Sequence, residues 1–419
     1  MVYVISQDDK PLMPCSNPIA RLLLKQGRAK IKKREPFTIK LTYDTTNYTQ
    51  DLTLGVDTGS RTIGTAVSKD TGEIVYMSEV VVRNDIADKM AQRAKYRRNR
   101  RNRKTRYRKS RWLNRANSIK NGRFSPTMQS KLNSHVKEIE YIKSVLPIRK
   151  MVFETGQFNT HLMKNPILSN SKVKHWGYQK GTNYGFENTK AMVLNRDNHT
   201  CQCCKGKSKD KVLNVHHIES RKTGGNAPNN LITLCETCHK GYHNGTIVLP
   251  NAIKRGMRFR DAAFMNIMRW TLYENLKKIY NNVSLTYGYI TKNIRINNGL
   301  SKSHYFDARC ISGNPTAKPL GYYFYQRKVR CHNRKIHKCK INKGGIRKRN
   351  QAAFVVHGFR LYDKVRWDGH ECFIFGRRST GRMDLRLLDG THINASVGFK
   401  NLKLLEKRNN YLTEVRKVS

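Results

Sequence analysis

The sequence predicts an α+β protein built from several domains. The chain has 419 residues. This is longer than a single domain with one core usually is, so roughly two or three domains are expected. Residues 52–83 and 364–399 alternate between apolar and polar positions like strands, whereas residues 127–146 and 259–280 repeat apolar positions at helical spacing. Hydrophobic residues make up only 38% of the chain, but they concentrate in these periodic segments, which can therefore form real cores.

The composition predicts a polyanionic partner. There are 82 lysines and arginines against 29 acidic residues, a net charge of +53. A free protein with this charge repels itself, whereas binding a polyanion releases counterions and is strongly favoured. The sequence has no lipidation motif, no long amphipathic helix for a membrane surface, and no apolar run near the roughly 20 residues that span a bilayer. Nucleic acid is therefore favoured over membrane.

The sequence also predicts a reducing compartment. The start, MVYVISQDDKPLMP, alternates like a strand and lacks the basic region and apolar core of a secretory signal. The cysteines concentrate in CxxC pairs, which are typical of metal ligands rather than of a disulfide scaffold. We therefore expect a cytoplasmic protein.

The first third of the chain predicts a small domain, a meander and a basic helix. A strand at 2–5, a helix near 20–30 and a strand at 36–43 come first, and three strands separated by turn sequences follow within 52–83. From residue 86 to about 120 the chain lacks an apolar face, and its basic residues recur at helical spacing. Such a rod either stays solvated and partly disordered or lies along a polyanion. Tyr96, Tyr107 and Trp112 either stack on bases or pack within the protein.

The rest of the chain predicts alternating helices and strands around a region rich in cysteine and histidine. The expected elements are a helix at 127–146, a strand at 150–155, an irregular link at 158–186, the Cys/His region at about 187–247, a helix at 259–280, a strand at 283–291, a helix at 301–312, a basic linker at 330–350 and a small β-barrel of short strands at 364–399.

Two paired cysteines predict a structural zinc site. Cys201 and Cys204 form one CxxC pair, and Cys235 and Cys238 form the other. Four thiolates suit a closed tetrahedral zinc site. Cys203 could replace a neighbour, but the spacing favours Cys201 and Cys204.

A second set of residues between and after these pairs predicts a different kind of site. His239 and His243 are four residues apart, so both imidazoles face one way on a helix, while the adjacent His216 and His217 point to opposite sides of a strand. One of these two can bind a cation while the other faces a substrate, as a one-metal phosphodiesterase requires. Alternatively, these histidines are further zinc ligands or ordinary surface residues.

Three separated carboxylates predict another metal site. Asp57 ends a strand before a glycine-containing turn, Glu154 ends a buried strand, and His304 and Asp307 lie one helical turn apart. Carboxylates at strand ends can converge at one edge of a sheet and hold two divalent ions for phosphoryl transfer. Taken singly, each is more simply a turn or structural residue.

The pattern HH-x12-N-x8-H-x3-H between and after the cysteine pairs resembles the HNH (ββα-metal) nuclease family. The resemblance implies that His217 is a general base and that His216, His239 and His243 bind Mg²⁺. It implies that Asn230 braces the loop that carries the base, although this position binds metal in some relatives.

The three carboxylate segments resemble the RuvC motifs of RNase H-like nucleases, most specifically in the sequence SHYFDA at 303–308. The resemblance implies an RNase H-like fold. It implies Asp57, Glu154 and Asp307 as metal ligands and His304 as a ligand or general base.

The order of these motifs, with KPLMP at 10–14, resembles the IscB family of transposon-associated (OMEGA-type) RNA-guided nucleases, relatives of type II CRISPR effectors. The chain is too short to hold the large recognition lobe of those effectors. The resemblance implies the following parts: 1–51, an N-terminal PLMP-type domain; 52–85, RuvC-I; 86–122, an arginine-rich bridge helix; 123–186, RuvC-II and a linker; 187–250, HNH; 251–330, RuvC-III; and 331–419, a linker and a C-terminal domain that reads a short target-adjacent motif.

The resemblance implies an RNA-guided DNA endonuclease that makes double-strand breaks. The HNH site would cut the guide-paired strand and the RuvC site the displaced strand, both with Mg²⁺ or Mn²⁺. The implied partners are a guide (omega) RNA and double-stranded target DNA, with a monomeric protein in a ribonucleoprotein near the prokaryotic nucleoid. The implied RNA contacts are Arg93, Arg97, Arg100, Arg101, Lys104, Arg108, Arg111 and Arg115. The candidate DNA contacts are Arg366, Arg377, Arg378, Arg382 and Arg386.

Two other functions compete with this interpretation. An unguided homing or junction-resolving endonuclease would use both folds, but it accounts neither for the arginine-rich helix nor for the charge. An RNA-binding protein with inactive nuclease folds would not need the intact carboxylates and the complete histidine set.

Overall fold

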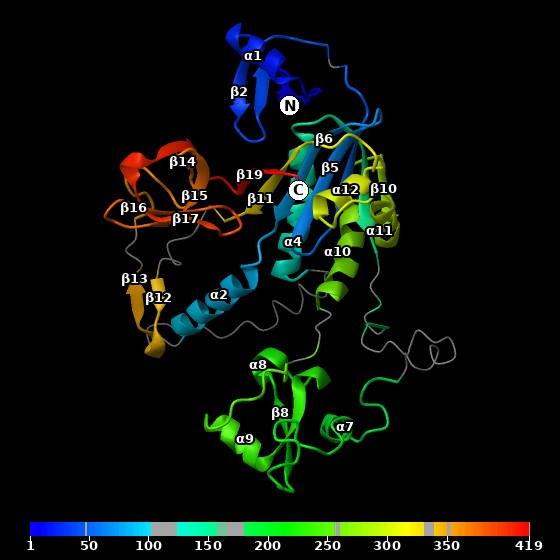
Figure 1. Cartoon of the computed structure of the whole chain (residues 1–419), viewed down its shortest axis with the longest axis vertical. Coiled ribbons are helices and arrows are strands. Elements are labelled where there is room, and N and C mark those ends of the chain that lie inside the picture. Colours follow the sequence, from blue (N-terminus) through cyan, green and yellow to red (C-terminus); the bar gives the residue numbers. More distant parts are fainter. Residues whose placement is uncertain are drawn as a thin grey trace. The chain divides into compact units, whose positions relative to one another are not determined.

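The chain folds into two compact units in the computed structural model (Figure 1). One unit combines Met1–Gly156 with Met265–Ser419, and the other is Gln157–Phe264. The structure describes residues 1–46, 48–101, 124–156, 159, 162–163, 180–254, 256, 260–330, 339–349 and 353–418. Within these residues, no helix combines the length and the apolar character needed to cross a bilayer.

The core of the first unit is a seven-stranded mixed sheet with the order β10-β7-β4-β5-β6-β11-β19. As predicted, β4 (Leu52–Asp57), β5 (Thr62–Lys69) and β6 (Ile74–Val81) form an antiparallel meander. The other strands are β7 (Ile148–Thr155), β10 (Val283–Tyr287), β11 (Tyr322–Lys328) and β19 (Tyr411–Lys417). Because β4, β7 and β10 run parallel to one another, their carboxyl ends meet at one edge of the sheet.

Helices cover both faces of this sheet. Met77 on β6 belongs to the same apolar cluster as Tyr305 of α12 (His304–Ile311). The neighbouring Tyr76 points to the opposite face and is influenced by the charge of Glu138 on α4 (Pro126–Lys143). Since adjacent strand residues point to opposite faces, α12 and α4 lie on opposite sides, as Figure 1 shows.

Two glycines let α12 approach the sheet closely. A Cβ atom on Gly55 of β4 would lie 2.2 Å from the carbonyl oxygen of Ala308, and one on Gly64 of β5 would lie 2.1 Å from that of His304. Any larger residue would therefore push α12 away. The side chain of Ser303 caps the helix by accepting a hydrogen bond from Phe306 N at 3.3 Å.

The N-terminal region forms a three-stranded sheet with the order β1-β3-β2 beside α1 (Asn17–Lys25). Its strands are β1 (Tyr3–Ile5), β2 (Ala29–Lys33) and β3 (Thr38–Leu41). The helix expected up to residue 30 ends at Lys25 because Gly27 has φ of +69° and the chain then enters β2. Similarly, the strand expected to reach residue 291 ends at Tyr287, where α11 (Gly288–Asn297) begins.

The C-terminal region forms a five-stranded antiparallel sheet with the order β17-β16-β15-β14-β18. The strands are β14 (Lys364–Trp367), β15 (His370–Arg377), β16 (Arg382–Arg386), β17 (His392–Gly398) and β18 (Lys403–Glu406). Apolar residues from four of them, such as Val365, Ile374 and Met383, make its core. In the described part of the chain β17 and β18 are open edges, so the predicted barrel is not confirmed. Part of the predicted basic linker pairs as β12 (Cys339–Ile341) with β13 (Arg347–Arg349).

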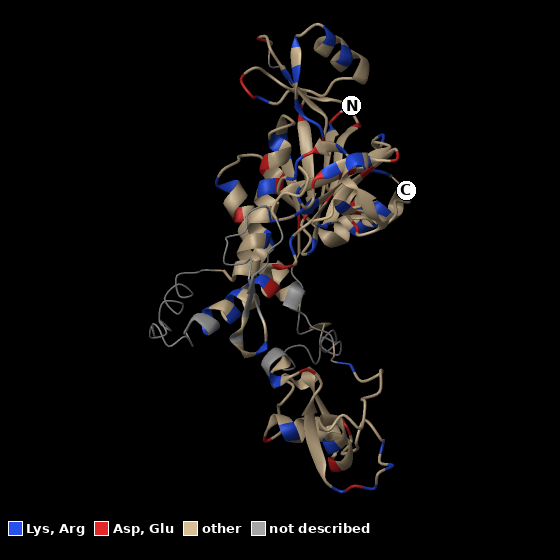
Figure 2. Cartoon of the chain, turned by 90° about the vertical axis from the view of Figure 1, so that its left-hand side faces the viewer, with Lys and Arg blue, Asp and Glu red and all other residues tan. Residues whose placement is uncertain are grey.

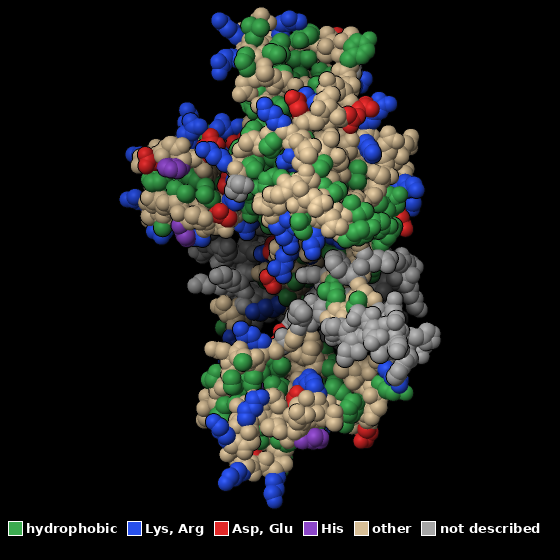
Figure 3. Space-filling model, turned by 45° about the vertical axis from the view of Figure 1, so that its right-hand side comes forward, with side chains coloured by type: hydrophobic (Ala, Val, Ile, Leu, Met, Phe, Trp, Pro, Cys, Tyr) green, Lys and Arg blue, Asp and Glu red, His purple; other side chains and the backbone are tan. Residues whose placement is uncertain are grey.

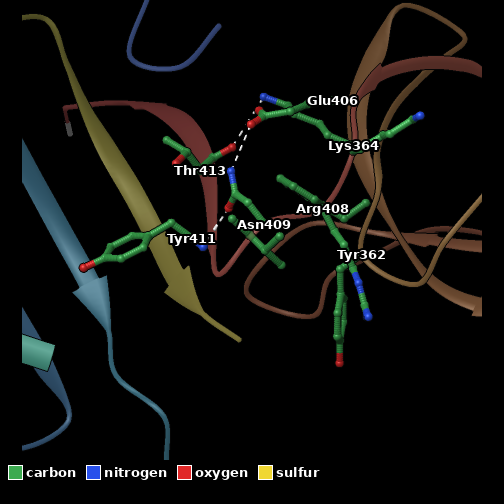
Figure 4. Close-up of a pocket in the computed structure, with 10 residues that line it drawn as sticks. Tyr362, Lys364, Glu406, Arg408, Asn409, Tyr411 and Thr413 are labelled. Atoms are coloured by element: carbon green, nitrogen blue, oxygen red, sulfur yellow. Dashed lines mark hydrogen bonds between the residues drawn. The ribbon is translucent and has the colours of Figure 1, made fainter. Parts of the chain in front are cut away.

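A buried lysine joins the two ends of this unit. Lys364 of β14 is only 4% exposed and bonds Glu35 of the N-terminal region and Glu371 of β15, the latter at 3.0 Å. Its ammonium also donates to the carbonyl oxygen of Thr413 on β19 at 3.4 Å, beside a small hollow that Lys364, Glu406 and Thr413 help to line (Figure 4). Removing one member of a buried charge pair typically costs about 3–5 kcal/mol, so this cluster fastens the N-terminal region to the C-terminal sheet.

The second unit contains a short hairpin followed by a helix. Its antiparallel strands β8 (Leu213–His217) and β9 (Leu231–Cys235) pair in register, and α9 (Glu236–His243) follows β9 directly. Before them lies α7 (Thr189–Arg196), whose Met192 and Val193 pack on Leu231. Two short turns, α8 (Arg221–Gly224) and η2 (Pro228–Asn230), connect the strands.

Candidate active sites

The hairpin and α9 bring three histidines together in the second unit. Strand β8 turns His216 inward, where it is 4% exposed, while His239 and His243 project from the same side of α9. Ring nitrogens of all three histidines lie within 4.8 Å of one another. This is the arrangement predicted from the four-residue spacing on α9 and the alternation along β8.

The electrostatics of this histidine cluster suit a divalent cation. Burial lowers the pKa of His216 to about 4, helped by the neighbouring His239 and His243. Burial also lowers the pKa of His239. His216 and His239 are therefore neutral at pH 7, the form in which imidazole binds metals. Within the described residues, His216 Nε2 is buried and has no hydrogen-bond partner, so the cluster fits a bound ion.

His217 lies on the other side of β8 from this cluster, and Asn230 supports the loop that follows it. Nε2 of His217 lies 3.0 Å from Asn226 Oδ1. The fully buried Asn230 accepts a hydrogen bond from Glu219 N at 2.9 Å and donates to the carbonyl oxygens of Glu219 and Gly225 at 2.9 and 3.0 Å. The geometry therefore favours the bracing role implied for Asn230 over a role as a metal ligand.

Replacing Asn230 with Ala is expected to loosen this loop. The change removes the three hydrogen bonds that the buried Asn230 side chain makes to half-buried backbone groups of Glu219 and Gly225, so the unit should lose about 1–3 kcal/mol of stability. If His217 has the role that the resemblance implies, DNA cleavage at this site should fall at least about tenfold, because the loop no longer holds that histidine. Thermal unfolding and strand-specific cleavage measure the two effects. Asn195→Ala, on the exposed surface of α7, is the matched control, and equal behaviour of both variants would contradict the bracing role.

Four cysteines form a separate cluster in the same unit. The sulfurs of Cys201, Cys204, Cys235 and Cys238 lie within 4.8 Å of one another, with Cys204 and Cys235 3.7 Å apart. A hydrogen bond from Ser208 lowers the pKa of Cys204 to about 6, which favours its thiolate, whereas burial raises the pKa of Cys201 and Cys238. The cluster is compatible with structural zinc, and Cys203 lies outside it, as the spacing predicts.

Replacing Cys238 with Ser is expected to abolish stoichiometric zinc binding and to destabilise the second unit. A structural zinc site of this size contributes to folding itself, so losing one buried thiolate weakens both metal binding and folding. Elemental analysis and thermal unfolding measure these effects. Cys203→Ser is the matched control and should keep its zinc. If Cys238→Ser retained zinc with unchanged stability, the cluster would not be a zinc site.

The first unit brings the three predicted carboxylates to one edge of its sheet. Asp57 and Glu154 stand at the ends of the parallel strands β4 and β7, and Asp307 faces them from α12. Each contacts a cationic or titratable side chain. Asp57 Oδ2 lies 2.6 Å from His304 Nδ1, and the other two contacts are Glu154 Oε1 to Arg269 Nη2 at 3.6 Å and Asp307 Oδ1 to Arg295 Nε at 2.9 Å.

Mutual repulsion among these carboxylates favours a cation. Burial and the neighbouring charge of Asp57 raise the pKa of Glu154 to about 7, and the same two causes raise the pKa of Asp307. The hydrogen bond with Asp57 raises the pKa of His304. An excess of buried negative charge is relieved by divalent ions, so these residues fit such ions. Their oxygens do not all lie within 4.8 Å of one another, unlike the two groups above.

Two arginines at this site were not predicted from the sequence. Arg269, on α10 (Arg260–Lys277), is 8% exposed, and its Nε and Nη2 both donate to the carbonyl oxygen of Thr58 at 3.2 Å. Thr58 in turn donates to the carbonyl oxygen of Glu154 at 2.7 Å, so this arginine ties the ends of β4 and β7 together. The sequence did contain an indication of the role of Arg269, because this arginine lies on the apolar face of α10 beside Met268 and Leu272, where a charged residue is unexpected. Arg295, the partner of Asp307, gives no such signal.

The basic helix predicted at 86–122 is observed as α2 (Ile86–Arg101), along which lysines and arginines recur (Figure 2). Arg93 and Arg97 are exposed on it, and the backbone of Arg100 and Arg101 ends it. Tyr96 is buried, so of the two possibilities for this ring, packing within the protein is correct. The remaining predicted members of this helix lie outside the described residues: Lys104, Tyr107, Arg108, Arg111, Trp112 and Arg115.

The C-terminal arginines differ in whether their side chains form ion pairs or hydrogen bonds within the protein. Arg366 pairs with Glu371 at 3.0 Å, and Arg386 pairs with Asp384 at 2.8 Å. Arg377 donates to the carbonyl oxygen of Phe359 at 3.2 Å and so holds a loop. The exposed residues are Arg366, Arg378 and Arg382, and Arg382 also donates to the carbonyl oxygen of Ser396 at 3.5 Å. Figure 3 shows lysines and arginines spread over the face in view rather than gathered in one patch.

Two family models match the chain. Residues 2–181 match the RRXRR protein model, and residues 201–245 match the HNH endonuclease model. None of the curated proteins matches. Solved structures with similarity include Streptococcus thermophilus Cas9 in complex with the AGAA PAM, at 15% identity, and with AGGA PAM, at 13% identity. Each alignment covers 45% of this chain and 26% of that chain, with a TM-score of 0.28, so the chain spans about a quarter of their length.

The two matched models account for separate parts of the chain. The HNH model covers the cysteine cluster and the histidine cluster, and the RRXRR model covers the meander, α2 and the strand that ends near Glu154. The letters RRXRR occur in the chain as RRNRR at residues 97–101, within α2. An RRXRR segment followed by an HNH endonuclease domain fits an IscB-like protein.

Proposed function

We propose that the protein is an RNA-guided DNA endonuclease that makes double-strand breaks with two separate metal-dependent sites. The observation that carries this proposal is the pairing, in one chain, of a histidine cluster in an HNH-type unit with three converging carboxylates on a mixed sheet. The net charge of +53 and the basic helix α2 support a nucleic-acid guide. We infer the seven-part domain layout given above, with the basic helix as the bridge to the guide RNA.

In the HNH-type unit, His216, His239 and His243 would hold a divalent cation. A bound Mg²⁺ or Mn²⁺ supplies charge stabilisation to the scissile phosphate and the leaving oxygen. His217, on the opposite side of β8, would accept the proton of the attacking water. With its Nε2 donating to Asn226, Nδ1 is the nitrogen left to take that proton. The proposed substrate of this site is the guide-paired strand.

In the first unit, Asp57, Glu154 and Asp307 would hold divalent cations and cut the displaced strand. The antiparallel meander flanked by parallel strands supports an RNase H-like fold for this unit. His304, in contact with Asp57, would act as a ligand or a general base. The C-terminal sheet would read a short motif beside the target, and the monomeric ribonucleoprotein would work in the prokaryotic cytoplasm.

The guided mechanism predicts that RNA from the native locus co-purifies with the protein and is required for cleavage. Digesting this RNA and repurifying the protein should abolish cutting of a matched target, because base pairing supplies the specificity. Adding back the sequenced RNA should restore cutting. A plasmid lacking the guide-matched target is the control substrate. A protein that cut DNA equally well after RNase treatment would be an unguided nuclease.

A further inference from the structure

Two exposed tyrosines flank the carboxylate site of the first unit. Tyr287 is the last residue of β10 and Tyr289 is the second residue of α11, and their side chains are 45% and 66% exposed. The two rings are nearly parallel, with centroids 6.0 Å apart and an interplanar angle of 15°. Large aromatic rings left open to solvent are a feature of binding surfaces rather than of a packed core.

Backbone register places the residues that carry these rings beside Glu154. Strand β10 pairs in parallel with β7, so that Thr286 lies opposite Glu154 and Tyr287 opposite Thr155. Gly288, between the two tyrosines, approaches the carboxylate so closely that a Cβ atom there would lie 3.1 Å from Glu154 Oε1. The residues that carry the two rings therefore lie next to Glu154 along the backbone at this edge of the sheet.

The charge around the pair suits a phosphate backbone. Helix α11 contains two basic residues, Lys292 and Arg295, and no acidic one. Lys292 is exposed and lies three residues after Tyr289, on the neighbouring turn. Arg295 contacts Asp307, another carboxylate of the same site. A strand entering this site would meet aromatic faces for its bases and positive charge for its phosphates.

We propose that Tyr287 and Tyr289 form a stacking platform for unpaired bases of the DNA strand cut at this carboxylate site. The proposal rests on the proposed function, in which that strand is displaced and single-stranded. Bases within a duplex are already stacked, whereas unpaired bases stack on exposed aromatic rings whatever their sequence. The platform would thus hold the scissile phosphate near the carboxylates without adding a sequence requirement to that of the guide.

The first test removes the rings in the guide-loaded complex. The double variant Tyr287→Ala/Tyr289→Ala should slow displaced-strand cleavage about 5- to 100-fold, the range expected for losing base stacking, and leave guide-paired cleavage unchanged. Tyr287→Phe/Tyr289→Phe should keep the wild-type rate, because stacking needs the ring and not the hydroxyl group. Tyr184→Ala, a similarly exposed tyrosine of the second unit at 61%, is the matched control. Equal rates for the Ala double variant and the wild type overturn the platform.

The second test alters the DNA instead. Abasic positions next to the displaced-strand cut should slow the wild-type protein by a similar factor and should slow the Ala double variant no further. Losses that multiply independently would show that the tyrosines act on something other than those bases, and would overturn the platform.

A binding measurement separates this proposal from the proposed function. A 2-aminopurine beside the displaced-strand cut should be quenched by the Asp57→Ala complex, and the quenching should disappear when both tyrosines are also replaced with Ala. Retained quenching overturns the platform. If the wild-type protein cut no displaced strand at all, the proposed function would fail, while ring-dependent quenching of single-stranded DNA would still support the platform.

Discussion

Replacing His217 with Ala is expected to convert the protein into a nickase that cuts only the displaced strand. Loss of a general base typically slows the affected step about 10²- to 10⁴-fold. The metal cluster should survive, because His217 lies on the opposite side of β8 from His216, His239 and His243. Cleavage of a target labelled on both strands, resolved on a denaturing gel, measures the two rates separately.

The control for this change is an exposed histidine in the same unit. His199 has φ of +46°, a conformation that Asn tolerates far better than Ala, so His199→Asn is the appropriate variant and should cut both strands normally. Loss of both cuts by His217→Ala, with unchanged folding, would contradict the assignment of one site to each strand.

Replacing Asp57 with Ala is expected to produce the opposite nickase, which cuts only the guide-paired strand. The change should weaken the binding of metal ions at this site. Because bound metal ions supply several kcal/mol of transition-state stabilisation, the rate of displaced-strand cleavage should fall roughly a thousandfold. Folding should be preserved, because the negative charge of Asp57 raises the pKa of Glu154 and Asp307 and its removal relieves that repulsion. Strand-resolved cleavage and circular dichroism test the two expectations.

Asp51→Ala is the matched control for Asp57→Ala. Asp51 immediately precedes the strand that Asp57 ends, and its side chain pairs with the exposed Arg149 at 3.1 Å. An exposed pair of this kind contributes little to stability, so the variant should cut both strands. If Asp57→Ala still cut the displaced strand at the normal rate, the carboxylate site would have to be reassigned.

Local sequence patterns were sufficient to predict those strands and helices whose apolar residues recur at the spacing typical of the element. The meander within 52–83 was predictable because apolar alternation and turn residues coincide. Strands β11 and β19 were not predicted because each is defined by pairing across the sheet, with β11 joining β6 to the chain's last strand. The end of β10 was missed because α11 begins at Gly288, and this glycine packs against Glu154, which is distant in the sequence.

The candidate sites divide in the same way. The histidine and cysteine clusters lie in one short segment, so spacing alone indicated which side chains converge. The carboxylate site could be outlined from strand ends, but its arginine partners could not, because Arg269 and Arg295 meet Glu154 and Asp307 only through the packing of α10 and α11. Long-range partners of this kind leave almost no trace in local sequence.

The split of the first unit around the second has a consequence for how the protein matures during synthesis. The histidine and cysteine clusters lie within residues 201–243, so they can assemble as soon as that segment has left the ribosome. The carboxylate site needs Asp57, Glu154 and then Asp307, and β19 completes its sheet only at Tyr411–Lys417. Since domains fold as units while the chain emerges from the N-terminus, a truncated product would carry the first site without the second.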